Sequence, residues 1–209
     1  MGVVPQESGT FDMLKADEHL RVFGRLQGLS LKVARERTEQ LLQTLDLAPH
    51  RHKLSWHLSG GLKRKLLMGM AIISHPPILV LDEPTTGLDP NSRREVWALI
   101  EGHRAEGATV LLTTHYMEEA EALCDHMAIL SLGRVLAKGS VDDIRSLCRN
   151  QFKATFQVNG TARTVLGKTH ADVAQEVEAM GIPEYALTKT SLEDLYLELT
   201  ARPKEQEAV

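Results

Sequence analysis

Two adjacent carboxylates follow a short apolar run in this sequence. Ile78–Leu81 is continuously apolar, and Asp82 and Glu83 come directly after it. Continuous apolarity bounded by a chain breaker is typical of a strand buried in a parallel sheet, and ligands bind at the carboxyl edge of such sheets. Two carboxylates at that edge suit ligation of Mg²⁺ and activation of a water molecule. A solvated turn is an equally good interpretation of this segment taken alone.

A serine followed by two glycines stands directly before a helical pattern. Ser59 is able to cap this helix, and Gly60 and Gly61 leave room for backbone N–H groups to approach an anion at its positive end. A phosphate group would fit there. An ordinary serine-capped helix is the alternative, and it is favoured when Leu58–Gly61 is considered alone.

A histidine follows the second apolar run of this kind. Thr109–Thr113 predicts another buried strand, and His115 comes two residues after it. If the two strands are parallel neighbours, His115 opens onto the same edge as the carboxylates and is able to donate a hydrogen bond to a phosphate oxygen. A structural or exposed histidine is the more common outcome for such a residue alone.

These residues have to be positioned by regular elements, and the hydrophobic pattern predicts an alternation of strands and helices. The expected helices cover residues 18–26, a segment capped by Ser30, 62–74, a segment that begins at Asp89 and Pro90, 117–124, 171–180 and 192–199. Besides the two buried strands, hairpins are expected at 127–138 and 152–166, with a further strand at 185–188. The alternation favours a doubly wound α/β core, followed by a small α+β appendage.

Composition limits the function classes. Of the 209 residues, 43% are hydrophobic and 25% are charged, as in a globular protein with a core. The net charge of -4 provides no basic field, so no nucleic-acid partner is expected. Two cysteines, Cys124 and Cys148, are too few for a disulfide framework and fit a reducing compartment. No signal peptide or membrane-length apolar stretch is recognisable, so any link to a membrane is expected through a partner.

Taken together, these motifs resemble those of the ATP-binding cassette (ABC) transporter ATPases. Leu58–Gly61 is similar to the signature motif of that family, and Ile78–Glu83 is similar to its Walker B motif. Gly87–Asp89 resembles the D-loop, His115 resembles the switch histidine, and Gly2–Gln6 resembles the Q-loop.

Two further segments are similar to one branch of the family, which includes bacterial drug- and polysaccharide-exporter ATPases and the lipid-transporting subfamily A. They are residues 113–121 and 191–200. The resemblance implies a partial P-loop NTPase parallel sheet with a helical lobe at about residues 10–75. It places a nucleotide-binding domain at residues 1–148 and a small carboxy-terminal α+β accessory domain at residues 149–209.

The resemblance also implies ATP and Mg²⁺ as cofactors and a role for each residue of one site. Asp82 would hold Mg²⁺ through water, and Glu83 would act as the base toward the attacking water. Gln6 would sense the metal and the water, and His115 would contact the γ-phosphate. Hydrolysis would then depend on positioning and electrostatics.

The remaining motif residues are implied to act between subunits. Ser59, Gly60 and Gly61 would complete the site of the opposite subunit in a head-to-tail homodimer or heterodimer, and Asp89 would couple the two sites. The expected partner is a multi-spanning membrane permease, which would hold the subunit at the cytoplasmic face of the membrane. Apolar residues between Phe11 and Phe23 would dock on this permease or form the core of the lobe.

One family motif is not found in its usual place. The family has a Walker A P-loop before the Q-loop, and this sequence starts at the Q-loop. We therefore expect an amino-terminally incomplete nucleotide-binding subunit and no ATP hydrolysis by the isolated chain. The alternative is a non-hydrolysing cassette remnant that supplies the signature motif in trans to a complete ATPase subunit. Leu62 replaces the usual glutamine of the signature, which is a minor departure.

Four other patterns in the sequence are expected to be structural rather than functional. Residues 162–169 satisfy a relaxed P-loop pattern but are too β-branched for a phosphate loop. The histidines at 50, 52 and 57 have no partners at ligand spacing and are expected in a polar loop. Asn159 is expected in a hairpin turn rather than as a glycosylation site, and Lys63–Lys65 on a solvated helix face.

Overall fold

The computed structural model describes residues 1–7, 9–158 and 160–201. The chain divides into two compact units, Met1–His115 and Tyr116–Val209. Among the described residues, no helix combines the length and the apolarity that crossing a bilayer requires.

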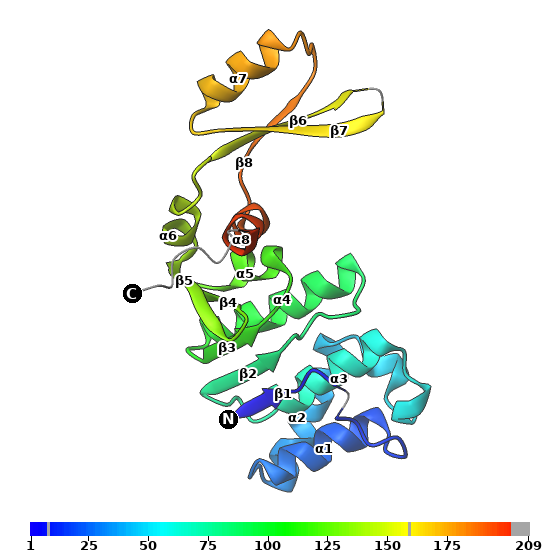
Figure 1. Ribbon diagram of the computed structural model, residues 1–209. Helices are drawn as coiled ribbons and strands as arrows, with labels where there is room; N and C mark the ends of the chain where they lie inside the picture. Colours follow the sequence, from blue (N-terminus) through cyan, green and yellow to red (C-terminus); the bar gives the residue numbers. More distant parts are fainter. Residues whose placement is uncertain (8, 159, 202–209) are drawn as a thin grey trace. The chain divides into compact units, whose positions relative to one another are not determined.

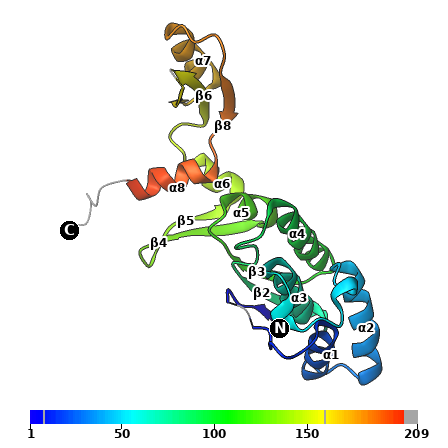
Figure 2. The ribbon, with the colours of Figure 1, turned by 90° about the vertical axis from the view of Figure 1, so that its right-hand side faces the viewer.

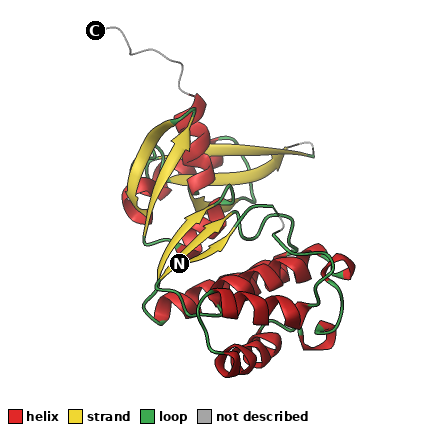
Figure 3. Ribbon diagram, turned by 90° about the horizontal axis from the view of Figure 1, so that it is seen from below, coloured by secondary structure: helices red, strands yellow, loops and turns green. Residues whose placement is uncertain are grey.

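The first unit contains a three-stranded parallel sheet in the order β1-β2-β3 (Figure 1). Figure 3 shows its strands in yellow beside the helices of the same unit. Its strands are β1 (Gly2–Val4), β2 (Ile78–Asp82) and β3 (Thr109–Thr113). The two predicted strands are confirmed as parallel neighbours, with Leu81 opposite Leu112 and Asp82 opposite Thr113. β1 was not predicted, because three residues before a proline are too few to show a period. The parallel direction brings the carboxyl ends of all three strands to one edge.

The described residues of this unit form four α-helices, and the sequence predicts each of them. They are α1 (Ala16–Leu26), α2 (Leu31–Thr44), α3 (Gly60–Ile72) and α4 (Pro90–Ala105). The predicted caps are confirmed, since the Ser30 side chain accepts from Val33 N and Asp89 caps α4. The first three helices gather beside β1 (Figures 1 and 2). The connection before α3 holds two short 3₁₀ turns, Ala48–His50 and Ser55–His57.

The three gathered helices pack through a glycine in the middle of α3. A Cβ atom on Gly69 would lie 2.7 Å from Leu45 Cδ1 and 2.9 Å from Leu20 Cδ2. Leu20, Leu45 and Leu66 are fully or almost fully buried. The missing side chain therefore allows the leucines to reach the backbone of α3, and this contact forms the core of the predicted helical lobe.

The third strand is less buried than the sequence predicts. Leu79 and Leu81 of β2 are fully buried, whereas Leu111 of β3 is 62% exposed. In the described sheet β2 has a neighbour on both sides, whereas β3 pairs only with β2. The apolar run was therefore a correct signal for a strand, but it did not report how well that strand is covered.

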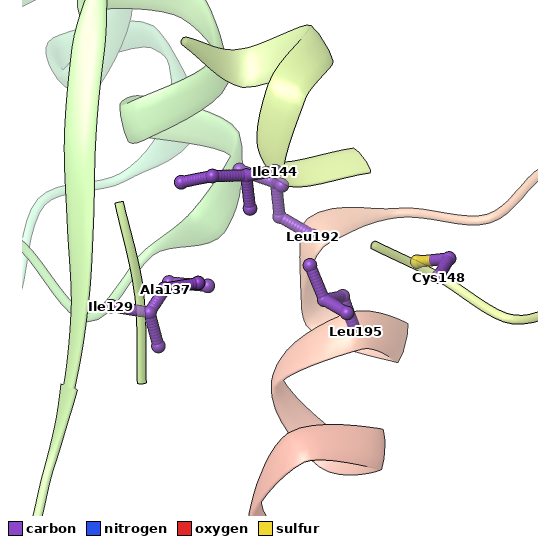
Figure 4. Close-up of a cluster of buried hydrophobic side chains, with 6 residues drawn as sticks. All are labelled: Ile129, Ala137, Ile144, Cys148, Leu192 and Leu195. Atoms are coloured by element: carbon purple, nitrogen blue, oxygen red, sulfur yellow. The ribbon is translucent and has the colours of Figure 1, made fainter. Parts of the chain in front are cut away.

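The second unit begins with a helix, a hairpin and another helix. They are α5 (Met117–Leu123), β4 (His126–Ser131), β5 (Arg134–Ser140) and α6 (Val141–Ser146). α6 was not predicted, although Ser140 and Asp143 form a capping box at its start. The last helix, α8 (Leu192–Ala201), returns to pack on this part. Its Leu192 and Leu195 join a buried cluster that Figure 4 shows with Ile129, Ala137, Ile144 and Cys148.

A second three-stranded sheet follows α6, in the order β7-β6-β8. It contains β6 (Phe152–Val158), β7 (Thr161–Gly167) and β8 (Ala186–Lys189), and α7 (His170–Ala179) covers it. The predicted hairpin is confirmed, while Asn159 of its turn lies outside the described residues. This part has its own core around Ala154, Phe156 and Val173. The predicted domain boundary at 148/149 coincides with the junction between α6 and β6, and it stays a proposal.

Candidate functional site

The carboxyl edge of the parallel sheet gathers chemically active side chains from three strands. Asp82 ends β2, Thr113 ends β3, and Gln6 follows β1. Glu83 and His115 come one and two residues after their strands. The sequence predicted that Asp82, Glu83 and His115 share this edge, and the structure brings all three there together with Gln6.

One oxygen atom of Glu83 is the meeting point of this edge. Gln6 Nε2 donates to Glu83 Oε2 at 3.0 Å, across 77 residues of sequence. Thr86 Oγ1 donates to the same oxygen at 3.0 Å, and His115 Nδ1 lies 3.3 Å from it. The carboxylate is thus the link between the ends of β1, β2 and β3.

The backbone of Glu83 adopts a conformation that is uncommon for its residue type. Its φ is +46°, in the left-handed region that glycine normally occupies. Its N–H is held by the carbonyl oxygen of Thr113 at 3.0 Å and by the Thr113 hydroxyl at 3.2 Å. Strained residues of this kind persist where the surroundings fix them, and they cluster at functional sites.

The surroundings keep Glu83 ionised. The hydroxyl of Thr86, followed by His115 and Gln6, holds the pKa of this carboxyl below its usual range. At neutral pH the group is therefore an acceptor-only carboxylate. Such a group is able to orient a water molecule or to accept a hydrogen bond from a phosphate-bound proton.

Asp82 is fixed by the neighbouring strand. The Thr113 hydroxyl donates to Asp82 Oδ1, which leaves the second carboxylate oxygen for another partner. Asp82, Glu83 and the amide of Gln6 provide hard oxygen atoms, which are the ligands that Mg²⁺ prefers in proteins. The residues at this edge therefore fit a magnesium ion.

A buried arginine holds these segments in place, and its position corrects the sequence interpretation. Arg64 was expected on a solvated face of α3 with its lysine neighbours, but it is only 6% exposed. Its Nε donates to the carbonyl of Pro84 at 2.6 Å, and its Nη1 donates to that of Pro5 at 2.7 Å. Its Nη2 donates to the carbonyls of Asp82, at 2.8 Å, and Glu83. One guanidinium thus joins the segment after β1 to the turn after β2.

A signal for this burial was present in the sequence. Arg64 lies three and four residues before Leu67 and Met68, both of which are buried on α3. Residues at this spacing share a helix face. The positive charge concealed that Arg64 belongs to the inner face, because arginine is rarely buried unless its donors are satisfied.

The serine and glycine motif lies at the start of α3. The Ser59 side chain accepts from Leu62 N at 3.3 Å, which confirms the predicted cap. Apart from its chain neighbours and the backbone of α3 itself, no described atom lies within 4 Å of a Cβ placed on Gly60. A Cβ on Gly61 would lie 3.7 Å from Leu88 Cδ2 and 3.8 Å from Ser92 Oγ, so the starts of α3 and α4 are neighbours. The amino-terminal ends of two neighbouring helices carry partial positive charge, which favours the binding of an anion between them.

Asp89 serves as the cap of α4. Its Oδ1 accepts from Asn91 N at 3.0 Å and from Ser92 N at 3.1 Å, while the Ser92 hydroxyl donates to Oδ2 at 2.7 Å. The bonds from Ser92, in particular, lower the pKa of the Asp89 carboxyl. The side chain is thus occupied in ordering the turn between Glu83 and α4.

The segment at 162–169 has the expected structural character. Residues up to Gly167 lie in β7, where Thr164 pairs with Thr155 and Val165 pairs with Ala154. Thr169 caps α7 through Asp172 N. A strand that is hydrogen-bonded along its length leaves no loop of N–H groups for a phosphate.

A parallel sheet flanked by helices, with acidic and amide side chains at its carboxyl edge, places this chain among the α/β proteins that bind ligands at that edge. The sequence profile of the ABC transporter family matches residues 1–86. A solved chain described as the structure of the ATP binding subunit of an ABC transporter superposes with a TM-score of 0.68 at 30% identity. That alignment covers 95% of this chain and 68% of the solved one. This chain belongs to the ABC transporter family.

Its relatives include exporter and lipid-transport proteins. The daunorubicin resistance ATP-binding protein DrrA3 of Streptomyces coeruleorubidus is 40% identical over 70% of this chain and 46% of its own length. The Nod factor export ATP-binding protein I of Cupriavidus metallidurans is 43% identical over 69% of this chain and 48% of its own length. The human phospholipid-transporting ATPase ABCA7 is 44% identical over 67% of this chain, which is 6% of that protein. The chain thus spans about half the length of the bacterial relatives.

Proposed function

We propose that this chain is part of the ATP-binding subunit of an ABC exporter, which couples ATP binding and hydrolysis to export through a separate membrane permease. The observation that carries the proposal is the convergence of Gln6, Thr86 and His115 on one oxygen of Glu83. A carboxylate held by three segments is suited to orient the water that attacks a phosphate, which is the main protein contribution to phosphoryl transfer.

The proposed cofactors, ATP and Mg²⁺, would bind at the same edge of the sheet. Asp82 and Gln6 would hold Mg²⁺, which neutralises charge on the phosphates when it is bound. Glu83 would accept the proton of the attacking water, and His115 would donate a hydrogen bond toward the terminal phosphate. Ser59, Gly60 and Gly61 would bind the nucleotide of a second subunit, in a homodimer or a heterodimer, and Asp89 would order the segment between the two sites.

The proposed location is the cytoplasmic face of the membrane, where a permease would hold the subunit. Phe11 is 57% exposed and Met13 is 76% exposed at the start of the helical lobe, whereas Leu20 is part of its core. The two exposed residues are the candidates for docking on the permease, since apolar groups at the centre of an interface supply most of its affinity.

The test is a measurement of Mg²⁺-dependent ATP turnover by the gene product that contains these 209 residues. We expect turnover in the unchanged protein and a loss of about 10²–10⁴-fold in Glu83→Gln, because the amide cannot accept the proton. Glu118→Gln, an exposed change of the same type on α5, serves as the control. Equal turnover in Glu83→Gln and the control would contradict the proposal.

The same preparation distinguishes the non-hydrolysing alternative. A protein without turnover that still stimulates a complete ATPase subunit, and loses this effect in Gly60→Ala, would act only in trans. In that case Glu83→Gln would leave the stimulation unchanged, since the signature residues alone would contribute.

A further inference from the structure

A second cluster of side chains with metal-ligating atoms lies at the amino ends of β2 and β3. The carboxylates of Asp82 and Glu83 lie at the opposite ends of these strands. His75 precedes β2, His103 lies in the last turn of α4, and Glu106 directly follows that helix as its C-cap. One ligand atom from each of these three residues lies within 4.8 Å of the other two. All three belong to the first compact unit.

The two imidazoles face the same carboxylate oxygen. His75 Nδ1 lies 2.9 Å from Glu106 Oε2, and His103 Nδ1 lies 3.8 Å from it. His103 is buried, and its second nitrogen, Nε2, lies 3.3 Å from the carbonyl oxygen of Pro76. A carbonyl only accepts, so a bond between them requires the proton on Nε2. In neutral His103 the lone pair of Nδ1 then faces the carboxylate, and a cation between them would satisfy both acceptors.

The surroundings of His103 match those of a metal ligand, and the backbone of His75 is held in place. Histidines that bind a metal commonly donate their other N–H to a backbone carbonyl, which fixes the ring, and Pro76 offers this carbonyl to His103. His75 has a φ of +51°, a left-handed conformation in which asparagine, aspartate and histidine are enriched among the residues other than glycine. Its N–H donates to the Ile72 carbonyl at 2.8 Å, so the turn after α3 holds this ring near the end of α4.

We propose that His75, His103 and Glu106 bind a zinc ion. Two imidazole nitrogens and one carboxylate oxygen form a ligand set that Zn²⁺ favours and that the all-oxygen preference of Mg²⁺ does not match. With Zn²⁺ bonds of about 2.0–2.1 Å, tetrahedral ligands lie about 3.4 Å apart. The side chains of His75 and Glu106 are 52% and 58% exposed. They therefore have room to rotate until their ligand atoms reach this separation. Water would complete the coordination.

The ion would bridge two segments of the first unit. It would tie the connection between α3 and β2 to the end of α4, next to the bond between Thr109 N and the Pro77 carbonyl that starts the pairing of β2 with β3. Because Asp82 and Thr113 end the same strands, the zinc ion would stabilise the end of the sheet that the nucleotide does not occupy.

The test is a calorimetric titration of the purified protein with Zn²⁺, followed by zinc X-ray absorption spectroscopy. We expect one tight site whose absorption spectrum shows two imidazole ligands. Glu106→Gln and His75→Asn change exposed residues, and asparagine tolerates the left-handed region, so both variants should fold. Each should weaken Zn²⁺ binding by about 100-fold or more, since even the loss of a partner behind a ligand costs about 10–100-fold. His75→Asn should also reduce the imidazole count to one.

Two control variants separate this site from the other histidines. His52→Asn changes an exposed histidine outside the cluster, and His115→Asn removes the histidine beside Glu83. Both should bind Zn²⁺ with unchanged affinity. The proposal is overturned if the unchanged protein takes up no zinc, if Glu106→Gln binds it equally well, or if binding is lost in His115→Asn instead.

Discussion

Arg64 and Asp82, which are 18 residues apart in the sequence, are joined by a hydrogen bond of 2.8 Å from Arg64 Nη2 to the carbonyl oxygen of Asp82. The same guanidinium also holds the carbonyls of Pro5 and Pro84. The backbone of the candidate site is thus fixed from inside the helical lobe. The carboxylates of Asp82 and Glu83 remain available because the anchoring bonds go to the main chain.

The first prediction concerns this arginine. Arg64→Ala removes a buried charge that satisfies several backbone carbonyls, so the free energy of unfolding should fall by about 2–4 kcal/mol. Arg64→Lys should recover only part of this loss, since a point charge cannot reach the same set of acceptors. Denaturant unfolding monitored by circular dichroism measures both. A change below about 0.5 kcal/mol in Arg64→Ala, the level of an ordinary surface substitution, would show that the anchor is unimportant.

A second prediction separates binding from stability at the start of α3. Gly60→Ala places a methyl group in open space and should leave the unfolding free energy unchanged or raise it by about 0.5–1 kcal/mol. The methyl group would nevertheless obstruct an anion at the helix start. We expect ATP turnover, or stimulation of a partner subunit, to fall on the order of 100-fold, as when an oxyanion donor is lost.

Gly102→Ala is the matched control for that experiment. Gly102 is an exposed helical glycine of α4 with equally open space around a Cβ, and it lies away from the start of the helix. The Gly102→Ala variant should gain as much unfolding free energy as Gly60→Ala, and its ATP turnover should stay normal. Equal turnover in the two variants would exclude an anion at Gly60.

The third prediction concerns the close packing of the lobe. Gly69→Ala gains helix propensity, but its methyl group would collide with buried Leu45 and Leu20. The net effect should be a loss of about 1–3 kcal/mol in unfolding free energy, the usual cost of overpacking. Gly102→Ala again provides the comparison, and thermal unfolding of both variants measures the difference. If Gly69→Ala and Gly102→Ala stabilise the protein to the same extent, the helical lobe packs more loosely around Gly69 than the structure indicates.

The fourth prediction is a pH dependence that arises from His19. This ring is buried, with Nδ1 2.8 Å from the Lys15 carbonyl and Nε2 accepting from Phe11 N at 2.9 Å. Burial lowers the pKa of His19 below 6.5. The unfolded chain then binds the proton more readily than the folded one. The stabilisation from neutral His19 is therefore complete above pH 6.5 and is lost as the pH falls through the lower folded pKa.

Urea unfolding between about pH 7 and pH 5 measures this effect. His19→Gln should lose part of the decline toward acid, because its side chain does not titrate. His57→Gln, a change at an exposed histidine, should retain the full decline. If the profiles of the unchanged protein and His19→Gln are parallel, the buried ring does not carry the pH dependence.

Local patterns in the sequence determined most of the elements. Ser30, Ser59 and Asp89 predict the helix starts that the structure has, because a cap acts within three residues of itself. The apolar runs Ile78–Leu81 and Thr109–Thr113 predict strands for a similar reason. From the order of these signals, the sequence also places the carboxylates and His115 at one edge, and it indicates the family.

The tertiary structure decided which distant residues meet and which of them are buried. Two of the partners of Glu83 are distant in the sequence: Gln6 lies 77 positions earlier, and His115 follows another strand. No local period in the sequence records such a pairing. Arg64 was placed in solvent on its charge alone, whereas its burial depends on carbonyls that only the folded turns present. His75 and Glu106, 31 residues apart, become neighbours because β2 and α4 bring the ends of separate segments together. Contacts of this kind follow from packing, which depends on all elements at once rather than on any one segment.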